Sequence, residues 1–339
     1  MTQVSFKIDF SKSVQSELGR VLSEQFNCAL QYLEQSSGSA DADAIHEFRK
    51  TTKKLRALLR LVSDSNSNTE VESAIERLRS AAGQLADSRD AATMEQNLRR
   101  AYRDLCPDVD LSSQGFGGLF LLEEFHRNEA SYPKSVQLRQ VRTDLLAAAA
   151  TIDISSLFDL DVTGLLKGMS RTYRKGRRLM KKANRSPSVV TLHRLRKRVK
   201  DYLYQLRLSV HLSPKVLRVQ ALEFDLLAAT LGEHHDLAIL LFAIDESRAS
   251  FRQLAEPHGL RNWVICQMQI RQDAALRLAK HLFKPSTKQE YRRLIAAAAI
   301  AEERRSRDIQ QTVHLQEIVE GCSLVRHRDR RIPGRQRSC

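Results

Sequence analysis

The chain reads Ile45-His46-Glu47-Phe48-Arg49-Lys50 in its first half and Leu192-His193-Arg194-Leu195-Arg196-Lys197 in its second half. In both stretches a histidine is followed by basic residues three, four, seven and fourteen positions later. This spacing places the histidine and the basic residues on one side of an α-helix. We call each such helix a basic cassette. The first contains His46, Arg49, Lys50, Lys53, Arg56 and Arg60, and the second contains His193, Arg196, Lys197, Lys200 and Arg207.

The basic side of each cassette does not lie opposite its apolar side. On a helical wheel the centres of the two arcs are only about 130° apart. The cations therefore flank the buried face and are expected to line a groove toward a neighbouring helix. Like charges four residues apart cost a few tenths of a kcal/mol each, which a bound anion would relieve. The alternative is an ordinary solvated helix face.

A second pattern follows each cassette in the same order. It is Leu85-Ala86-Asp87-Ser88-Arg89-Asp90 in the first half and Leu231-Gly232-Glu233-His234-His235-Asp236 in the second. The separation from the cassette histidine to the last aspartate is 44 residues in one half and 43 in the other. Two features in one order at nearly one spacing predict an internal duplication. We therefore expect two helical bundles of similar plan.

The composition indicates an all-α protein. The chain has 339 residues, of which 42% are hydrophobic, with only 13 glycines and 7 prolines, and no hairpin signal occurs between alternating apolar runs. We divide it into an N-terminal leader (1–10), a first helical half (11–155), a second helical half (156–320) and a basic tail (321–339) that we expect to be disordered. Helices are predicted at 11–35, 43–62, 69–105 (one long or two broken), 119–151, 162–184, 188–211, 214–231, 234–255, 259–283 and 285–320.

The charge is strongly positive and uneven. The net charge is +15, and residues 162–200 contain 14 Lys or Arg and no Asp or Glu. Arg174 and Arg177 belong to a dense basic helix in this stretch. Such a field attracts phosphate-bearing partners, but it does not by itself separate nucleic acid, anionic lipid and free polyphosphate.

Cysteine usage and the N-terminus indicate a cytoplasmic protein. The five cysteines are scattered without a Cys-x-x-Cys pair, which is typical of reduced thiols. Residues 1–10 contain no long apolar run of the kind that forms a signal peptide. The longest nearly uncharged stretches, around Ala147 and Ala296, are too short to span a bilayer.

The two cassettes and the Leu231–Asp236 pattern resemble the CHAD family, the conserved histidine α-helical domain. The resemblance covers roughly residues 11–320. It implies two four-helix bundles related by a pseudo-twofold axis, with a basic central channel between them. It also implies binding of inorganic polyphosphate and association with polyphosphate granules. The positions that it assigns to the anion are the cassette residues, together with Arg174 and Arg177 from the basic helix before the second cassette.

The sequence departs from a symmetrical pattern at several positions. Leu203 and Asp201 stand where the first cassette has Arg56 and Lys54. CHAD domains are often fused to a CYTH domain, whose Glu-x-Glu-x-Lys signature does not occur here, so we expect a stand-alone CHAD protein.

Catalytic signatures are sparse. His234-His235-Asp236 suggests a metal site of the kind found in His-Asp phosphohydrolases, with His193 as a further ligand. No carboxylate-rich partner segment is evident, and the alternative is a helix end with a capping or packing role. The chain has no P-loop and no Gly-x-Gly-x-x-Gly. We therefore predict no catalysis, no metal and no cofactor.

Three functions compete on the sequence alone. The first is non-catalytic binding of inorganic polyphosphate. The second is a nucleic-acid binder, favoured by charge alone, because aromatics are only 6% of the chain and none is interleaved with the basic stripes. The third is a metal-dependent phosphohydrolase. The paired histidines either fix the groove as neutral groups or contact phosphate as protonated groups.

Overall fold

The computed structural model describes residues 5–35, 42–63, 69–85, 87–105, 134–152, 161–246, 259–300 and 302–303. This part of the chain is helical and contains no strand. Its helices are α1 (Val14–Gln35), α2 (Ala42–Ser63), α3 (Thr69–Gln84), α4 (Asp87–Leu105), α6 (Lys134–Ala150), α8 (Val162–Arg185), α9 (Val189–Leu208), the short 3₁₀ helix η1 (Val210–Leu212), α10 (Pro214–Glu246) and α12 (Leu260–Leu282). Residues 287–300 are also helical. The all-α class is thus confirmed for the described residues.

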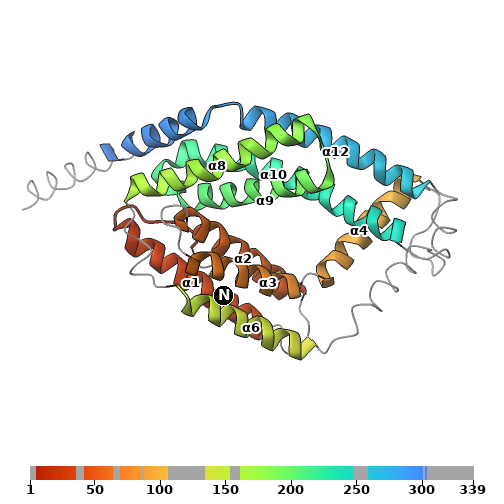
Figure 1. The fold of residues 1–339 in the computed structure, drawn as a ribbon, viewed down its shortest axis with the longest axis horizontal. Coiled ribbons are helices and arrows are strands. Elements are labelled where there is room, and N and C mark those ends of the chain that lie inside the picture. The colour runs from red at the N-terminus through yellow and green to blue at the C-terminus, as the bar shows by residue number, and fades with distance from the viewer. Residues whose placement is uncertain are drawn as a thin grey trace, which may run out of the picture.

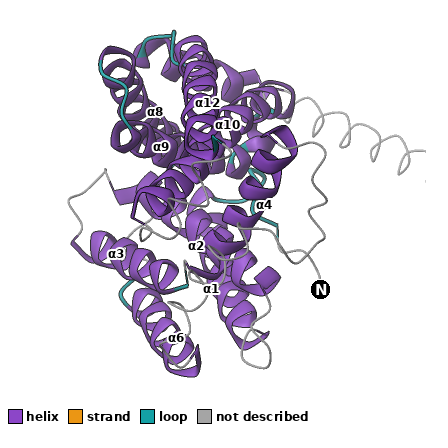
Figure 2. Cartoon of the chain, turned by 90° about the vertical axis from the view of Figure 1, so that its right-hand side faces the viewer, coloured by secondary structure: helices purple, strands orange, loops and turns teal. Residues whose placement is uncertain are grey.

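The helices form two groups that lie against each other (Figure 1). The N-terminal group consists of α1, α2, α3 and α6, in which α2 packs on α1 and α3. The C-terminal group consists of α8, α9, α10 and α12, in which α9 lies between α8 and α10. Figure 2 shows the same two groups from the side, with α2 nearest the C-terminal group. The junction is made where α2 packs against α8 and α9, so the two basic cassettes meet there.

Helix α4 belongs by sequence to the stretch 11–155 but packs on the C-terminal group. Its Met94, Leu98 and Tyr102 form a small core with Leu240 of α10 and Val264 of α12. The indole Nε1 of Trp263 also donates a hydrogen bond to Asp104 Oδ2 at 3.2 Å, although Trp263 follows it by 159 residues. The two groups of helices therefore do not follow the order of the sequence throughout.

One hydrophobic core runs through both groups. Phe48 and Leu55 of α2 and Leu195 and Val199 of α9 are fully buried within it. These residues are the apolar positions of the two cassettes, spaced so that they share one side of their helices. Burial of this side fixes the rotation of α2 and α9, and with it the direction of the cations on the adjacent side.

Polar contacts between the groups add to this core. Arg60 of α2 pairs with Asp201 of α9 at 2.9 Å, and Gln205 of α9 donates to the main-chain oxygen of Ala57 at 3.0 Å. Helices α2 and α8 approach so closely that a Cβ atom on Gly168 would lie 2.3 Å from the main-chain oxygen of Leu61. Glycine at this position allows the two backbones to come together.

The N-terminal leader is part of the packed structure from residue 5. Ile8 is fully buried, and its amide donates to the main-chain oxygen of Leu208 at the end of α9, at 2.9 Å. The leader is therefore tied to the C-terminal group before α1 begins. Helices α8 and α9 start at side-chain caps, where Asp161 accepts from the amide of Gly164 and Ser188 from that of Thr191.

The structure differs from the predicted helices at one notable place. We expected separate helices at 214–231 and 234–255, with His234 and Asp236 near a helix end. Instead α10 runs unbroken from Pro214 to Glu246, so the prediction of a helix terminus here is wrong. Gly232 lies within the expected break, but Leu231 and Leu237 on either side of it are buried, and their packing outweighs the low helix propensity of glycine.

Of the remaining predictions, one concerns a stretch that the structure describes and others concern residues outside the described ranges. The stretch 69–105 is two helices, α3 and α4, rather than one. The tail 321–339 lies outside the described residues, as do residues 119–133 of the helix predicted at 119–151.

Among the described helices, α10 is long and apolar enough to cross a bilayer. However, 44% of its most apolar window is buried, and Leu217, Phe224 and Leu231 belong to the core. A buried core helix has the same length and composition, so α10 gives no clear sign of a membrane span.

Candidate functional site

A pocket of about 200 Å³ lies where α2, α9 and α10 meet, with one contribution from α4. We call it the cationic pocket. Each of its lining residues has a polar or charged side chain: Arg49, Lys53, Arg56, Thr93, His193, Arg196, Lys197, Lys200, Asp201, Tyr204, His235 and Asp236. Six of them are Lys or Arg and two are Asp, so the charge of the lining is clearly positive.

The pocket exists because the two cassettes face each other across the junction of the helix groups. The first cassette supplies Arg49, Lys53 and Arg56, and the second supplies four residues from His193 to Lys200. These side chains are mostly half-buried, whereas Leu55 and Leu195 on the adjacent sides of the helices are fully buried. The placement agrees with the wheel, on which the cations flank the apolar side.

The cations in this pocket are crowded. Burial, followed by the charge of the neighbouring Arg60, lowers the pKa of Arg56 to about 10. The buried Nε atom of Arg56 has no hydrogen-bond partner within the described part of the chain. Burial also lowers the pKa of Lys197, with further contributions from Arg79 and Arg56. A lowered pKa of a base means that its surroundings disfavour the positive charge. A multiply charged anion in the pocket would relieve this repulsion.

Two histidines stack at one side of the pocket. The rings of His193 on α9 and His235 on α10 lie 4.3 Å apart between centroids, at an angle of 39°. Burial, then the charges of Lys197 and Arg196, lowers the pKa of His193 to about 4. Burial, then the charge of Arg196, lowers that of His235 to about 3. Both rings are therefore neutral at pH 7, and the buried Nδ1 atom of each has no hydrogen-bond partner among the described residues.

The carboxylates of the lining differ in their surroundings. Asp201 is buried and accepts from Arg60 at 2.9 Å and from Arg198 at 3.0 Å. Burial raises the pKa of Asp201, while the two guanidinium groups act in the opposite direction. Asp236 is half-buried beside His235. In the described part of the chain, no three His, Cys, Asp or Glu side chains gather as a potential metal site.

Several residues that the sequence assigned to the site do not line the cationic pocket. Arg60 is engaged with Asp201, and Lys50 pairs with Glu47 at 3.0 Å. Arg207 pairs with Asp225 at 2.9 Å. His46 is half-buried on α2 but is not among the lining residues.

The two arginines assigned to the site from the basic helix before the second cassette lie away from the cationic pocket. Arg177 of α8 donates from Nε to the main-chain oxygen of Phe283, at 3.0 Å, and so joins α8 to the end of α12. Arg174 is exposed on the same helix. Neither residue lines the cationic pocket.

A second, larger cavity lies next to the first. Its volume is about 590 Å³, and Lys50 and Arg207 are among its lining residues. Tyr204 of α9 lines both cavities, so the two cavities adjoin at this side chain. We call it the N-terminal pocket because residues 5–7 form part of its wall.

The family model for the CHAD domain matches residues 20–245 of this chain. The chain belongs to the CHAD family. The match begins within α1 and ends within α10, so both cassettes and the cationic pocket fall inside the CHAD region. Helix α12 lies beyond it in sequence but packs on α10 and α8 of the CHAD region. Comparisons with curated proteins and with solved structures find no match for this chain.

Sequence reasoning missed part of the lining of this CHAD pocket. His235 and Asp236 stood out as a repeated pattern and were grouped with His193 only as possible metal ligands, whereas the structure places all three in the lining of the cationic pocket. Tyr204 lies eleven residues after His193, on the basic side of the same helix, so the statement that no aromatic residue is interleaved with the basic stripes is wrong at this position. Thr93 and Asp201 carried no signal, because their places depend on how α4 and α2 pack on the C-terminal group.

Proposed function

We propose that this protein binds inorganic polyphosphate, with the cationic pocket as the centre of the site. The observation that supports this most is that two segments 147 residues apart, at His46 and His193, bring their cations to one cavity lined mainly by charged side chains. A chain of phosphoryl groups offers closely spaced negative charges along its length and no apolar surface. Arginine forks and lysine ammonium groups are suited to such oxygens.

The crowding of the cations supports the same proposal. A protein gains no stability from holding Arg56 and Lys197 where their positive charge is disfavoured. A polyanion would stabilise the charged forms and release condensed counterions, so its affinity should fall steeply as salt increases.

The proposal extends to the shape of the complete site. Lys50 and Arg207 line the adjoining cavity instead and are paired with Glu47 and Asp225, so we place them outside the path of the polyphosphate. A long polyphosphate would follow a basic channel between the two helix groups, contacting counterpart positions of a duplicated fold. His46, Arg174 and Arg177 lie outside both linings, and we give them no direct role in the centre of the site.

We also propose that binding is not coupled to hydrolysis. Of the two carboxylates in the lining, Asp201 is engaged by Arg60 and Arg198. A phosphate-release assay with purified protein, polyphosphate and Mg²⁺ or Mn²⁺ tests this. Release that disappears in His193→Ala or Asp236→Ala variants would establish an enzyme in place of a binding module.

The ligand class is tested by competition at near-physiological salt. Fluorescent polyphosphates of graded length are titrated against the protein, and DNA and RNA are added as competitors at equal phosphate concentration. We expect polyphosphate to displace nucleic acid, and nucleic acid to displace polyphosphate poorly. Equal competition in both directions would favour a non-specific nucleic-acid binder.

The cytoplasm, and polyphosphate granules within it, are the proposed location of the protein.

A further inference from the structure

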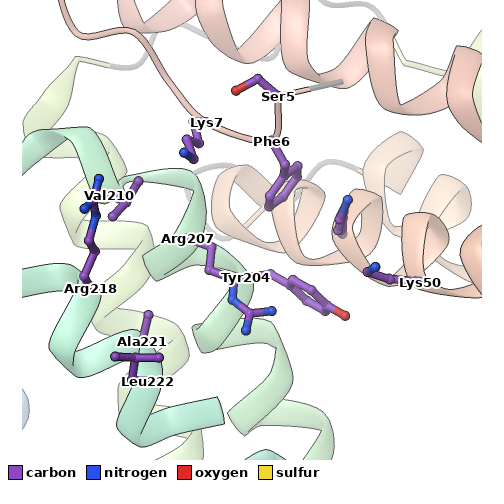
Figure 3. A pocket seen from close by; sticks show the side chains of 11 residues that line it. Ser5, Phe6, Lys7, Lys50, Tyr204, Arg207, Val210, Arg218, Ala221 and Leu222 are labelled. Carbon is purple, nitrogen blue, oxygen red and sulfur yellow. The ribbon is translucent and has the colours of Figure 1, made fainter. Parts of the chain in front are cut away.

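The N-terminal pocket differs in chemistry from the cationic pocket. Figure 3 shows side chains reaching it from the N-terminal segment, from α2 and from the C-terminal group. Its volume of about 590 Å³ lies in the range of small-molecule sites, which is about 300–1,000 Å³. The lining residues are Ser5, Phe6, Lys7, Lys50, Lys54, Tyr204, Arg207, Val210, Arg218, Ala221 and Leu222.

One part of this lining is apolar. The rings of Phe6 and Tyr204 stand edge to face, 6.3 Å apart between centroids. Val210 and Ala221 continue this surface, and Leu222 at its margin is 69% exposed. By contrast, apart from Tyr204, which lines both cavities, the lining of the cationic pocket consists of Arg, Lys, His, Asp and Thr side chains. Bare phosphate has nothing to gain from such a wall, whereas a ligand with an apolar or aromatic body does.

The other part of the lining is cationic. Lys50 and Arg207 are paired with Glu47 and Asp225. Lys7, Lys54 and Arg218 form no ion pair with the described residues, although three separate elements bring them to one cavity.

The position of Lys54 is the most informative of these. Its Nζ atom lies 5.5 Å from the centroid of the Phe6 ring. Burial, followed by the charge of Lys50, lowers the pKa of Lys54. Because the Lys54 ammonium group is partly withdrawn from water, an anion beside it would stabilise its charge. Because the same group lies over the Phe6 ring, that anion would sit next to an aromatic surface.

We propose that the N-terminal pocket is a separate binding site for an organic phosphate, a molecule that joins a phosphate group to an aromatic or apolar body. The body lies against Phe6, Tyr204 and Leu222, and the phosphate faces Lys54 and Arg218. A nucleotide and an alkyl phosphate both have this chemistry. The proposal does not depend on polyphosphate binding, because it uses residues that the cationic pocket does not contain, apart from Tyr204.

The test compares matched pairs of probes by isothermal titration calorimetry with the full chain. Adenosine triphosphate is compared with inorganic triphosphate, and hexyl phosphate with inorganic phosphate. Burial of the organic body should make the organic member of at least one pair bind about tenfold more tightly. The pair that shows the difference identifies the source, a nucleotide or an alkyl phosphate. Inorganic members that bind as tightly as both organic ones would overturn the proposal.

Single substitutions in the lining of the N-terminal pocket test whether the organic phosphate binds there. Arg218→Gln changes an exposed side chain and leaves the core intact, and Lys54→Met keeps the packing on Phe6 while removing the charge. Each should weaken the organic phosphate about tenfold, as expected for loss of a charged hydrogen bond. Neither should weaken long polyphosphate by more than about twofold.

A second set of variants separates this proposal from the first. Arg196→Ala with Lys197→Ala should weaken polyphosphate but leave the organic phosphate within about twofold. If this pair abolished binding of the organic phosphate, or if Arg218→Gln and Lys54→Met left it unchanged, the N-terminal pocket would not be a separate site. Loss of long polyphosphate in Arg218→Gln and Lys54→Met would likewise make this cavity an extension of the first.

Discussion

At the scale of single residues, Asp201 holds together cations from two helices. It is buried between Arg60 of α2 and Arg198 of its own helix. Replacing it with asparagine leaves Arg60 buried without its charge partner. We expect the free energy of unfolding to fall by about 3 kcal/mol, in the range for breaking a buried pair. Urea denaturation measures this.

The control for this variant is an exposed pair. Glu76→Gln breaks the contact with Arg79, in which both side chains are mostly exposed, and should change stability by less than about 1 kcal/mol. If Asp201→Asn lowered the free energy of unfolding as little as Glu76→Gln does, Asp201 would not be a structural link between the helix groups.

Asp201→Asn should lower the stability of the protein but raise its affinity for polyphosphate. Asp201 lines the cationic pocket, and Asp201→Asn removes one of its two negative charges. We expect polyphosphate to bind several-fold more tightly, most clearly at low salt, where electrostatic contributions are least screened. Fluorescence titration at two salt concentrations measures this. Weaker binding by a folded variant would place the polyphosphate elsewhere.

His193 and His235 predict a pH dependence of stability. In the unfolded chain, histidine has a pKa of about 6.5. In the folded protein these two stay neutral down to about pH 4 and 3. The unfolded state therefore binds more protons between these values, so the free energy of unfolding falls as pH decreases from about 6.5 to about 4.

The variant His193→Asn with His235→Asn isolates this contribution. Denaturation in urea at pH 7 and pH 5 should show a smaller loss of stability in the variant than in the wild type. An equal loss in both proteins would mean that the two imidazoles are not held neutral by the fold.

Local sequence showed which residues share a helix side, but not which distant residue each one meets. The row from Arg49 to Arg56 follows from helical periodicity, as does that from His193 to Lys200. The pairing of Arg60 with Asp201 joins positions 141 residues apart, so Arg60 looked like another ligand-facing cation. The sequence grouped His193 with His235 only as possible metal ligands, and the contact between their rings could not be seen for the same reason.

At the scale of elements, the close approach of α2 and α8 depends on one glycine. A Cβ atom at Gly168 would lie 2.3 Å from the main-chain oxygen of Leu61, so the two backbones would have to separate. We expect Gly168→Ala to lower the free energy of unfolding by about 2 kcal/mol, as for overpacking of a core.

Gly83 provides the matched control. It lies near the end of α3, and a Cβ atom there would meet nothing within 4 Å. Gly83→Ala should stabilise the protein by up to about 1 kcal/mol through helix propensity. Thermal unfolding followed by circular dichroism compares the two variants, and a neutral Gly168→Ala would contradict the close approach.

Element boundaries were predictable where the sequence carries local signals. Asp161 and Ser188 cap α8 and α9 within a few residues of the predicted starts. The break expected within α10 was wrong, because packing on α9 and α12 maintains the helix through Gly232. Local signals could not show that α4 packs on α10 and α12 rather than on α3 and α6, its neighbours in sequence.

At the scale of the whole molecule, the shared core predicts cooperative unfolding. The same cluster contains Leu18 and Leu55 from the N-terminal group and Leu195 and Phe224 from the C-terminal group. Neither group can lose its packing without exposing part of the other. We expect a single transition in differential scanning calorimetry, with near-ultraviolet and far-ultraviolet circular dichroism signals changing together. Two separated transitions would show that the two groups are independent domains.

We propose that polyphosphate is bound by the cations that face one another across the helix junction, and not by the total charge of the protein. Two charge-matched variants distinguish these possibilities. Arg196→Ala with Lys197→Ala removes two cations from the pocket, and Arg277→Ala with Lys280→Ala removes two exposed cations from α12. Polyphosphate affinity is measured for both at one salt concentration. We predict a loss of at least about tenfold for the first pair, from two charged hydrogen bonds, and less than about twofold for the second. Equal losses would contradict the account.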